Sequence, residues 1–228
     1  MNRLVVFDCD GTLVDSQGNI VRAMTDCFRN HGLADPCPRA TRRVVGLSLV
    51  EAMQALLPDA AHDLHRSLAE DYKNAFQRLR GHGLVEEPLF DGTREVIAAL
   101  DAAGWLMGVA TGKSDRGLKL CLDHHGLTGH FVTLQTADRH PSKPHPAMLH
   151  AAIAEAGATP ASTLMIGDTA YDMEMAVAAG AVPVGVAWGY HEADELRAAG
   201  ATVVLDHFND LHDQLDALLA RFAPESRP

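Results

Sequence analysis

Two carboxylates near the start of the chain have a spacing that suits metal and phosphoryl chemistry. Asp8 and Asp10 directly follow the apolar run Leu4–Phe7. In an extended chain, side chains two positions apart point to the same side. Two like charges that close are unfavourable unless a cation lies between them or one carboxyl is protonated. The pattern favours a hard divalent cation such as Mg²⁺, with one carboxylate attacking phosphorus and the other transferring a proton, over a solvated acidic turn.

A second polar group, T-G-K-S at residues 111–114, follows the apolar run Leu106–Ala110. A hydroxyl and backbone amides at a helix start can hold a phosphate, so Thr111 and Gly112 are candidate phosphate-binding residues. A P-loop is excluded by spacing, because the first glycine of that motif would fall at Met107. An ordinary N-capped helix is the alternative interpretation.

Two further segments carry charged residues that could complete a site. Lys143 stands in a proline-rich loop at residues 142–146, where an isolated lysine is usually a solvated charge. Asp168 and Asp172 follow the apolar run Leu164–Ile166, and carboxylate oxygens at a strand end are the ligands that Mg²⁺ prefers. The alternative for Asp172 is a cap on the following helix.

Residues 8–16 read D-C-D-G-T-L-V-D-S, which resembles the first motif of the haloacid dehalogenase superfamily of phosphohydrolases, D-x-D-G-T-L-x-D-S. The resemblance implies that Asp8 is the nucleophile that forms an aspartyl-phosphate and that Asp10 is the general acid and base. It also implies that Asp8 ligates Mg²⁺ through its other oxygen, and that Asp10 ligates it through the backbone carbonyl.

The other segments resemble the remaining motifs of that family in the expected order. Thr111 matches the strand-terminal hydroxyl of the second motif. Lys143 matches the lysine of K-P-x-P, which implies that it neutralises the transferring phosphoryl group and pairs with Asp8. Asp168 and Asp172 match G-D-x-x-x-D, which implies that Asp168 is a metal ligand and that Asp172 is a second one, directly or through water.

The elements that must position these residues alternate along the chain. Short apolar runs bounded by turn residues are typical of strands in a buried parallel sheet, and helical patterns lie between them from residue 90 onward. This alternation predicts an α/β fold with a doubly wound parallel sheet. The expected strands are Leu4–Phe7, Leu106–Ala110, Phe131–Leu134, Leu164–Ile166, Val182–Ala187 and Thr202–Leu205, and the expected helices are Thr93–Ala102, Asp115–His125, Ala147–Ala156 and Asp172–Ala179.

Residues 17–87 interrupt the alternation with helical periodicity and no strand-like run. We therefore predict an all-helical cap domain at residues 17–87, inserted into a core domain of residues 1–16 and 88–223, with a disordered tail at 224–228. A cap at this point can close over a site at the carboxyl end of the first strand.

An insertion directly after the first motif resembles the branch that contains phosphoglycolate phosphatase, pyrophosphatases and β-phosphoglucomutase. Within the insertion, Arg42, Arg43 and Gly46 lie in a loop similar to the branch's substrate loop. The resemblance to this branch makes 2-phosphoglycolate the leading substrate, and the arginines suit it because a guanidinium pairs bidentately with a carboxylate. The alternatives are another sugar or nucleotide monophosphatase, a pyrophosphatase, β-phosphoglucomutase or, from a different class, a non-catalytic phospho-accepting signalling receiver.

The composition limits the partners. With 47% hydrophobic and 21% charged residues, the chain has the composition of a globular protein, and its net charge of −11 disfavours nucleic-acid and anionic-membrane binding. The four cysteines form no C-x-x-C pair, and the first apolar run is too short for a secretory or membrane segment. We expect a cytoplasmic monomer or homodimer that acts on a small phosphorylated metabolite.

Overall fold

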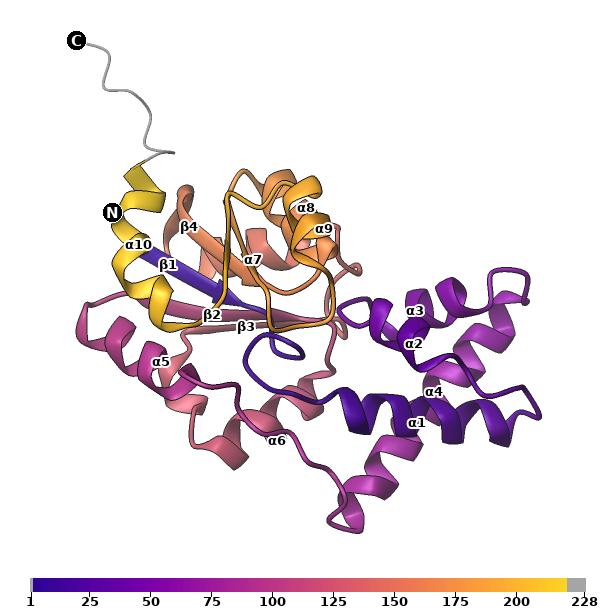
Figure 1. Ribbon diagram of the computed structural model, residues 1–228. Helices are drawn as coiled ribbons and strands as arrows, with labels where there is room; N and C mark the ends of the chain where they lie inside the picture. Colours follow the sequence, from indigo (N-terminus) through magenta and orange to yellow (C-terminus); the bar gives the residue numbers. More distant parts are fainter. Residues whose placement is uncertain (1, 221–228) are drawn as a thin grey trace.

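The computed structural model describes residues 2–220, which form a parallel β-sheet with helices on both faces (Figure 1). The strand order is β3-β2-β1-β4-β5-β6, and all neighbouring strands are parallel. This confirms the predicted α/β fold with a doubly wound parallel sheet. The strands are β1 (Asn2–Phe7), β2 (Leu106–Thr111), β3 (Thr133–Thr136), β4 (Ala158–Gly167), β5 (Val182–Val186) and β6 (Val203–Leu205).

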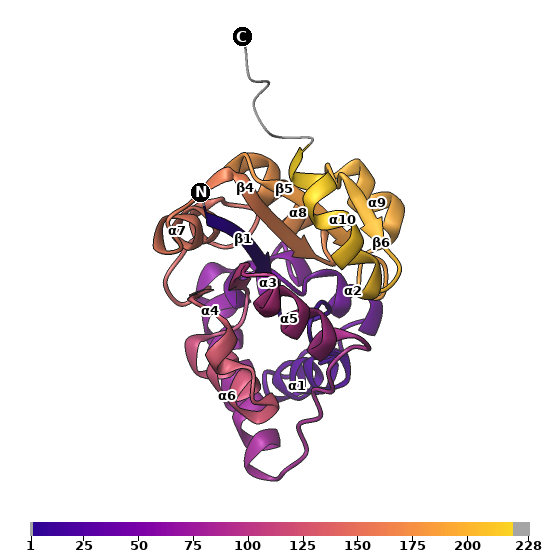
Figure 2. The ribbon, with the colours of Figure 1, turned by 90° about the vertical axis from the view of Figure 1, so that its left-hand side faces the viewer.

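Helices cover both faces because successive side chains of a strand point to opposite sides. The core helices are α5 (Thr93–Ala102), α6 (Asp115–His125), α7 (Ala147–Glu155), α8 (Ala170–Ala179), α9 (Ala193–Ala198) and α10 (Asn209–Ala220), with a 3₁₀ turn η1 (Thr128–His130). Val5 and Phe7 belong to the cluster with α5, α6 and α10, whereas Leu4 and Val6 pack with α7 and α8. Figure 2 accordingly shows α7 and α10 on opposite sides of β1.

The third strand lies two residues later than the apolar pattern predicts. The prediction of Phe131–Leu134 is wrong in its bounds, since β3 spans Thr133–Thr136. Its polar side chains are buried and have partners: Gln135 Nε2 donates to Glu155 Oε2 at 2.8 Å. A strand whose buried positions are polar gives no apolar run in the sequence, which is why its bounds were missed.

The predicted helical insertion is present between β1 and α5. Its helices are α1 (Gln17–Asn30), α2 (Pro38–Arg43), α3 (Leu49–Leu56) and α4 (His62–Gly81), and they lie beyond the carboxyl ends of the strands (Figure 1). The apolar faces of α1, α3 and α4 form a hydrophobic cluster of their own, with Met24, Met53 and Leu68 in its centre. The insertion therefore has its own core.

Two linkers connect the insertion to the sheet, and they run side by side. Val14 bridges to Leu89, and the Asp15 amide donates to the Pro88 carbonyl at 2.8 Å. We propose that residues 17–87 are the cap and that residues 1–16 and 88–223 are the core; the last three of these and the tail 224–228 lie outside the described residues. No helix within residues 2–220 has both the length and the apolar character that a bilayer span requires.

Candidate active site

The site lies where the strand order of the sheet reverses. From β1 the chain continues to β2 and β3 on one side and then to β4, β5 and β6 on the other, so β1 and β4 are neighbours. Phe7 pairs with Ile166 in register, and the Asp8 amide donates to the Ile166 carbonyl at 2.9 Å. The residues that follow these strands, Asp8 and Asp168, therefore meet at the topological switch point, where ligands bind in open α/β sheets.

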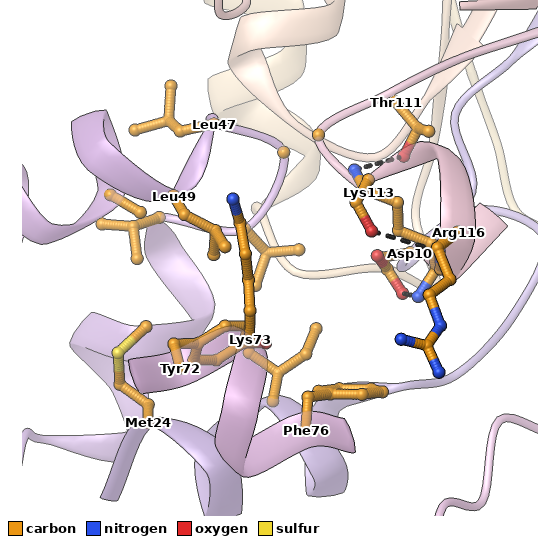
Figure 3. A pocket seen from close by; sticks show the side chains of 18 of the residues that line it. Asp10, Met24, Leu47, Leu49, Tyr72, Lys73, Phe76, Thr111, Lys113 and Arg116 are labelled. Carbon is orange, nitrogen blue, oxygen red and sulfur yellow. Dashed lines mark hydrogen bonds and ion pairs between the residues drawn. The ribbon is translucent and has the colours of Figure 1, made fainter. Parts of the chain in front are cut away.

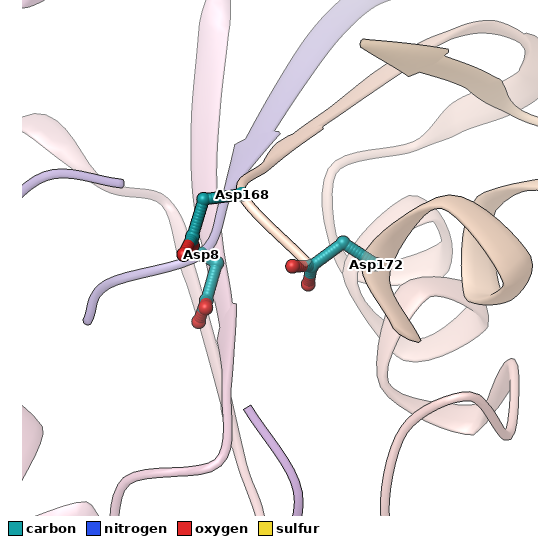
Figure 4. A group of neighbouring side chains, drawn as sticks. All are labelled: Asp8, Asp168 and Asp172. Carbon is teal, nitrogen blue, oxygen red and sulfur yellow. The ribbon is translucent and has the colours of Figure 1, made fainter. Parts of the chain in front are cut away.

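Three buried carboxylates converge there. Asp8, Asp168 and Asp172 come from the ends of β1 and β4 and the first turn of α8, and they point toward one another (Figure 4). One carboxylate oxygen of each lies within 4.8 Å of those of the other two. Burial raises the pKa of Asp8, and burial together with the charges of Asp8 and Asp172 raises that of Asp168 well above its usual value.

This cluster fits a magnesium ion. Asp8 is fully buried, and its Oδ2 has no hydrogen-bond partner within residues 2–220, whereas Oδ1 faces Lys143. A buried carboxylate oxygen without a donor is costly, and a divalent cation would supply the missing contact and offset the mutual repulsion. The donors are all oxygens, which Mg²⁺ prefers over nitrogen and sulfur.

Lys143 is the buried cation of the site. Its Nζ lies 2.9 Å from Asp8 Oδ1 and 2.7 Å from Asp172 Oδ1, and its side chain is fully buried. Burial alone would lower the pKa of Lys143, but the charges of Asp172 and Asp8 outweigh it and raise the pKa. The lysine therefore stays charged beside the carboxylates of Asp8 and Asp172.

Asp172 has two structural tasks in addition to any contact with a metal. Its Oδ2 accepts from the Thr169 amide at 3.1 Å while the Asp172 amide donates to the Thr169 hydroxyl oxygen at 3.4 Å, and these two bonds form a capping box at the start of α8. The Thr169 hydroxyl also donates to Oδ2 at 2.7 Å. Its Oδ1 faces Lys143. We propose ligation through water, because that form leaves both contacts intact.

Asp10 points into a second charged cluster that sequence reasoning missed. Its Oδ1 lies 2.8 Å from Lys113 Nζ and accepts a hydrogen bond from the Ser16 hydroxyl. Lys113 Nζ also lies 2.8 Å from Oε1 of Glu87, and Arg80 pairs with the same carboxylate at 2.8 Å. Burial raises the pKa of Asp10, although the charge of Lys113 opposes this. The only sequence signals were a lysine after the Thr-Gly pair and a glutamate at the expected hinge.

The phosphate-binding candidates lie beside the cap. Thr111 ends β2, and its hydroxyl accepts from the Lys113 amide at 3.3 Å. A Cβ added to Gly112 would lie 2.6 Å from the Leu47 carbonyl oxygen and 2.8 Å from that of Gly46, so only glycine allows the cap loop to come this close. The alternative interpretation of this segment, an N-capped helix, also holds, because the Ser114 hydroxyl accepts a hydrogen bond from an amide in the first turn of α6.

The cap arginines lie away from this group. Arg43 forms an ion pair with Glu195 at the start of α9, and Arg42 lies 3.5 Å from the side-chain oxygen of Gln17. Both arginines line a separate cavity of 320 Å³ beside Trp188. The structure does not bring these two guanidinium groups into the cavity that contains Asp8 and Asp10.

That larger cavity, of 530 Å³, lies between cap and core. Asp10, Thr111 and Lys113 lie on its core side, and mostly apolar side chains of the cap face them (Figure 3). The cap contributes Ile20, Met24, Thr41, Val44, Val45, Gly46, Leu47, Leu49, Ala52, Tyr72, Lys73, Phe76, Gln77, Arg80 and Gly81. Gly46 is thus the one predicted cap residue that lines it.

The loop after β5 holds Asp168 in place. A Cβ at Gly189 would lie 2.1 Å from Cβ of Asp168, so a larger residue cannot stand there. The Tyr190 amide donates to Asp168 Oδ2 at 2.9 Å, and Trp188 Nε1 donates to the Thr12 carbonyl at 3.1 Å. This loop positions the carboxylate, which its sequence alone did not indicate.

Comparisons with known proteins agree with this geometry. The chain is 37% identical over 224 residues, 96% of either sequence, to "Probable phosphatase IndB" of Dickeya dadantii. It is 32% identical to the N-acetylmuramic acid 6-phosphate phosphatase of Pseudomonas aeruginosa, over 95% of this chain and 96% of that one. A crystal structure of a hydrolase from Pseudomonas syringae superposes with a TM-score of 0.83 at 26% identity, covering 95% and 99% of the two chains. Residues 5–186 match the model of one family, and the chain belongs to it: the haloacid dehalogenase-like hydrolases.

Proposed function

We propose that this phosphoric monoester hydrolase transfers the phosphoryl group to Asp8 and then to water, with Mg²⁺ as its cofactor. The observation that carries the proposal is the convergence of Asp8, Lys143 and Asp168 at the switch point of the sheet. A carboxylate that attacks a phosphoryl group needs positive charge beside it, both for itself and for the phosphoryl oxygens. Lys143 supplies such a charge, and the carboxylates can hold a metal ion that supplies the other.

In the first step, a carboxylate oxygen of Asp8 attacks phosphorus and the bond from phosphorus to the ester oxygen breaks. Asp10 donates its proton to the departing alkoxide, and burial favours the protonated form that this requires. Lys143 offsets the charge of the attacking carboxylate and of the phosphoryl oxygens. We assign the hydroxyl of Thr111 and the amide of Gly112 to bind those oxygens.

In the second step, water attacks the phosphorus of the aspartyl-phosphate, Asp10 takes the proton of that water, and inorganic phosphate leaves with Asp8 restored. Mg²⁺, held by Asp8, the backbone carbonyl of Asp10 and Asp168, with Asp172 through water, would stabilise the charge that develops on the phosphoryl oxygens. The cap excludes bulk water from the site while it is closed.

The test is replacement of the nucleophile. Asp8→Asn keeps the shape of the side chain and removes the attacking charge, so hydrolysis of p-nitrophenyl phosphate should fall below detection while the circular dichroism spectrum stays unchanged. A variant that retains a tenth of the activity would refute the assignment. Many turnovers per wild-type chain would exclude the signalling-receiver alternative, because a receiver releases at most one phosphate.

The substrate itself remains a prediction. 2-Phosphoglycolate is the candidate that the family resemblance favours, with other sugar or nucleotide monophosphates, pyrophosphate and β-phosphoglucomutase chemistry as alternatives. The charge argument for glycolate is weakened because Arg42 and Arg43 do not line the catalytic cavity. A cytoplasmic location and a monomeric or homodimeric state are likewise predictions from the sequence.

A further inference from the structure

We infer that the alcohol released by this enzyme carries a planar ring, of aryl or nucleobase type, which occupies the cavity between cap and core. The inference rests on the proposed function, because it places the phosphate end of the substrate at Asp8. It concerns only what lies beyond the phosphate, where the cap side chains are.

The size of the cavity is the first argument. Its 530 Å³ is within the range of roughly 300–1,000 Å³ that small-molecule sites enclose. Glycolate has only two carbons, one of them in its carboxylate, and would leave most of that space unfilled, so the cavity walls would lose contacts. A ring-bearing alcohol fills it.

The chemistry of the walls is the second argument. Tyr72 and Phe76 of α4 line the cavity, with ring centroids 6.1 Å apart, and Met24 and Leu49 line it on the same cap side (Figure 3). Aromatic and apolar walls favour a ring that stacks or packs edge-on. They would desolvate a carboxylate without replacing its hydrogen bonds.

The charged side chains on the cavity wall do not reverse the preference for a ring over a carboxylate. Lys113 pairs with Asp10 and Glu87, Arg80 pairs with Glu87, and Lys73 pairs with Glu70 at 2.9 Å. Arg116 lines the cavity, but it is an exposed residue in the first turn of α6. A polar edge of the ring can face Arg116, whereas the apolar body lies against the aromatic side chains of α4.

A buried hydroxyl in the cap supports a ligand at this place. Thr41 of α2 is fully buried and lines the cavity, and its Oγ1 has no hydrogen-bond partner within residues 2–220. Buried hydroxyls are almost always paired, and an unpaired one is costly. A hydroxyl or carbonyl group of the bound alcohol would provide the missing partner.

The experiment compares kcat/KM for four compounds: acetyl phosphate, which carries no ring, 2-phosphoglycolate, (1-naphthyl)methyl phosphate, whose leaving group is an alkoxide like that of glycolate, and uridine 5′-monophosphate. At least one of the two ring compounds should exceed 2-phosphoglycolate by roughly tenfold or more, as expected of apolar burial and aromatic contact. Whichever of the two ring compounds has the higher kcat/KM identifies the type of ring, aryl or nucleobase.

Two variants test the residues. Phe76→Leu keeps the apolar volume and removes the ring face, and should lower kcat/KM for the preferred ring ester, relative to acetyl phosphate, by roughly threefold to tenfold. Thr41→Val removes only the hydroxyl and should lower the same ratio. Phe28→Leu makes the same change in the core of the cap, outside the cavity lining, and should leave the ratio unchanged.

The outcomes separate the inference from the proposed function. If acetyl phosphate is hydrolysed but 2-phosphoglycolate equals or exceeds both ring esters, the inference is overturned and the phosphatase assignment stands. The same holds if Phe76→Leu and Phe28→Leu change the ratio equally. If the purified wild-type protein with Mg²⁺ hydrolyses none of the four, the proposed function itself fails.

Discussion

In the proposed mechanism, Asp10 holds a proton when the alkoxide leaves and has lost it before water attacks. Its surroundings suit both needs, since burial raises its pKa whereas the charge of Lys113, 2.8 Å away, opposes that rise. Lys113 also contacts Glu87, at the end of the proposed cap, so this lysine links Asp10 to the proposed hinge.

Asp10→Asn should slow the turnover of an alkyl phosphate by about 10²–10⁴-fold, the usual contribution of general acid and base catalysis. The loss should be smaller for p-nitrophenyl phosphate, whose leaving group needs no proton. Steady-state kcat on both esters measures this. Equal losses on the two would show that Asp10 does not act as the acid.

Lys113→Met should shift the pH profile of kcat to higher pH and lower its maximum. Lys113 lowers the pKa of Asp10, so its removal leaves Asp10 protonated at higher pH and delays the step in which Asp10 acts as a base. Lys119→Met removes an exposed lysine paired with Asp123 and is the matched control. A profile of unchanged shape would mean that Lys113 only supports the fold.

At the scale of the elements, the loop of residues 44–48 after α2 approaches the turn after β2 so closely that side chains are excluded. Gly112→Ala would place a Cβ 2.6 Å from a backbone oxygen of Leu47. Because a backbone oxygen cannot rotate away as a flexible side chain can, the loop of residues 44–48 would have to move away from the turn. The cap should then close incompletely, and kcat/KM should fall by roughly 10²-fold.

Gly129→Ala is the control for that prediction, because a Cβ at Gly129 meets nothing within 4 Å. Kinetics of both variants on p-nitrophenyl phosphate, with melting temperatures to confirm folding, provide the measurement. If Gly112→Ala were as active as Gly129→Ala, closure of this loop onto the turn would not be needed for catalysis.

The sequence predicted best the strands whose buried side chains are apolar. The apolar runs identified β2 and β5 to within one residue, since both faces of these strands are buried. They placed β3 two residues too early and found β1 from Leu4 onward and only the end of β4, which begins at Ala158. The pattern also did not identify α9, a helix of six residues, because so short a segment shows little periodicity.

The site was predictable to a similar degree, for a related reason. Asp8, Lys143 and Asp168 stand at strand ends or in motifs, and the parallel sheet brings such positions to one edge. The placement of Arg42 and Arg43 depends on how the cap packs against α9, and no local pattern encodes a contact between segments that far apart.

At the scale of the molecule, His191 connects the cap to the core through two hydrogen bonds. The Ala170 amide donates to His191 Nδ1 at 3.1 Å, so Nε2 carries the proton and donates to the Arg43 carbonyl at 3.2 Å. Burial lowers the pKa of His191 and outweighs the hydrogen bond to the Arg43 carbonyl, which raises it. The charge of the Arg43 side chain lowers the pKa further, and the charges of Glu195 and Glu174 raise it. The ring is neutral in the folded protein.

Acidification should therefore weaken the protein through His191. In the unfolded chain this histidine takes up a proton as the pH falls below about 6.5. In the folded protein its pKa is lower, so protonation there needs a lower pH. The stability that the neutral ring contributes above pH 6.5 is therefore lost on acidification. Between pH 7.5 and 5.5, wild type should lose more free energy of unfolding than His191→Asn, which keeps an acceptor for the Ala170 amide. Urea titrations at both pH values measure the difference, and equal losses would exclude His191 as the cause.

Mg²⁺ should stabilise the whole molecule, because the folded protein confines three carboxylates that repel one another and the unfolded chain does not. At a concentration one hundred times Kd, a ligand of the folded state adds about 2.7 kcal/mol, which for a chain of this size raises Tm by roughly 5–10 °C. Asp168→Asn should remove most of that increment, and Asp123→Asn, at an exposed position outside the site, should keep it. Calorimetry with EDTA and with Mg²⁺ provides the measurement. An increment as large in Asp168→Asn as in wild type would mean that the ion binds elsewhere, and full hydrolytic activity after exhaustive chelation would show that catalysis does not need it.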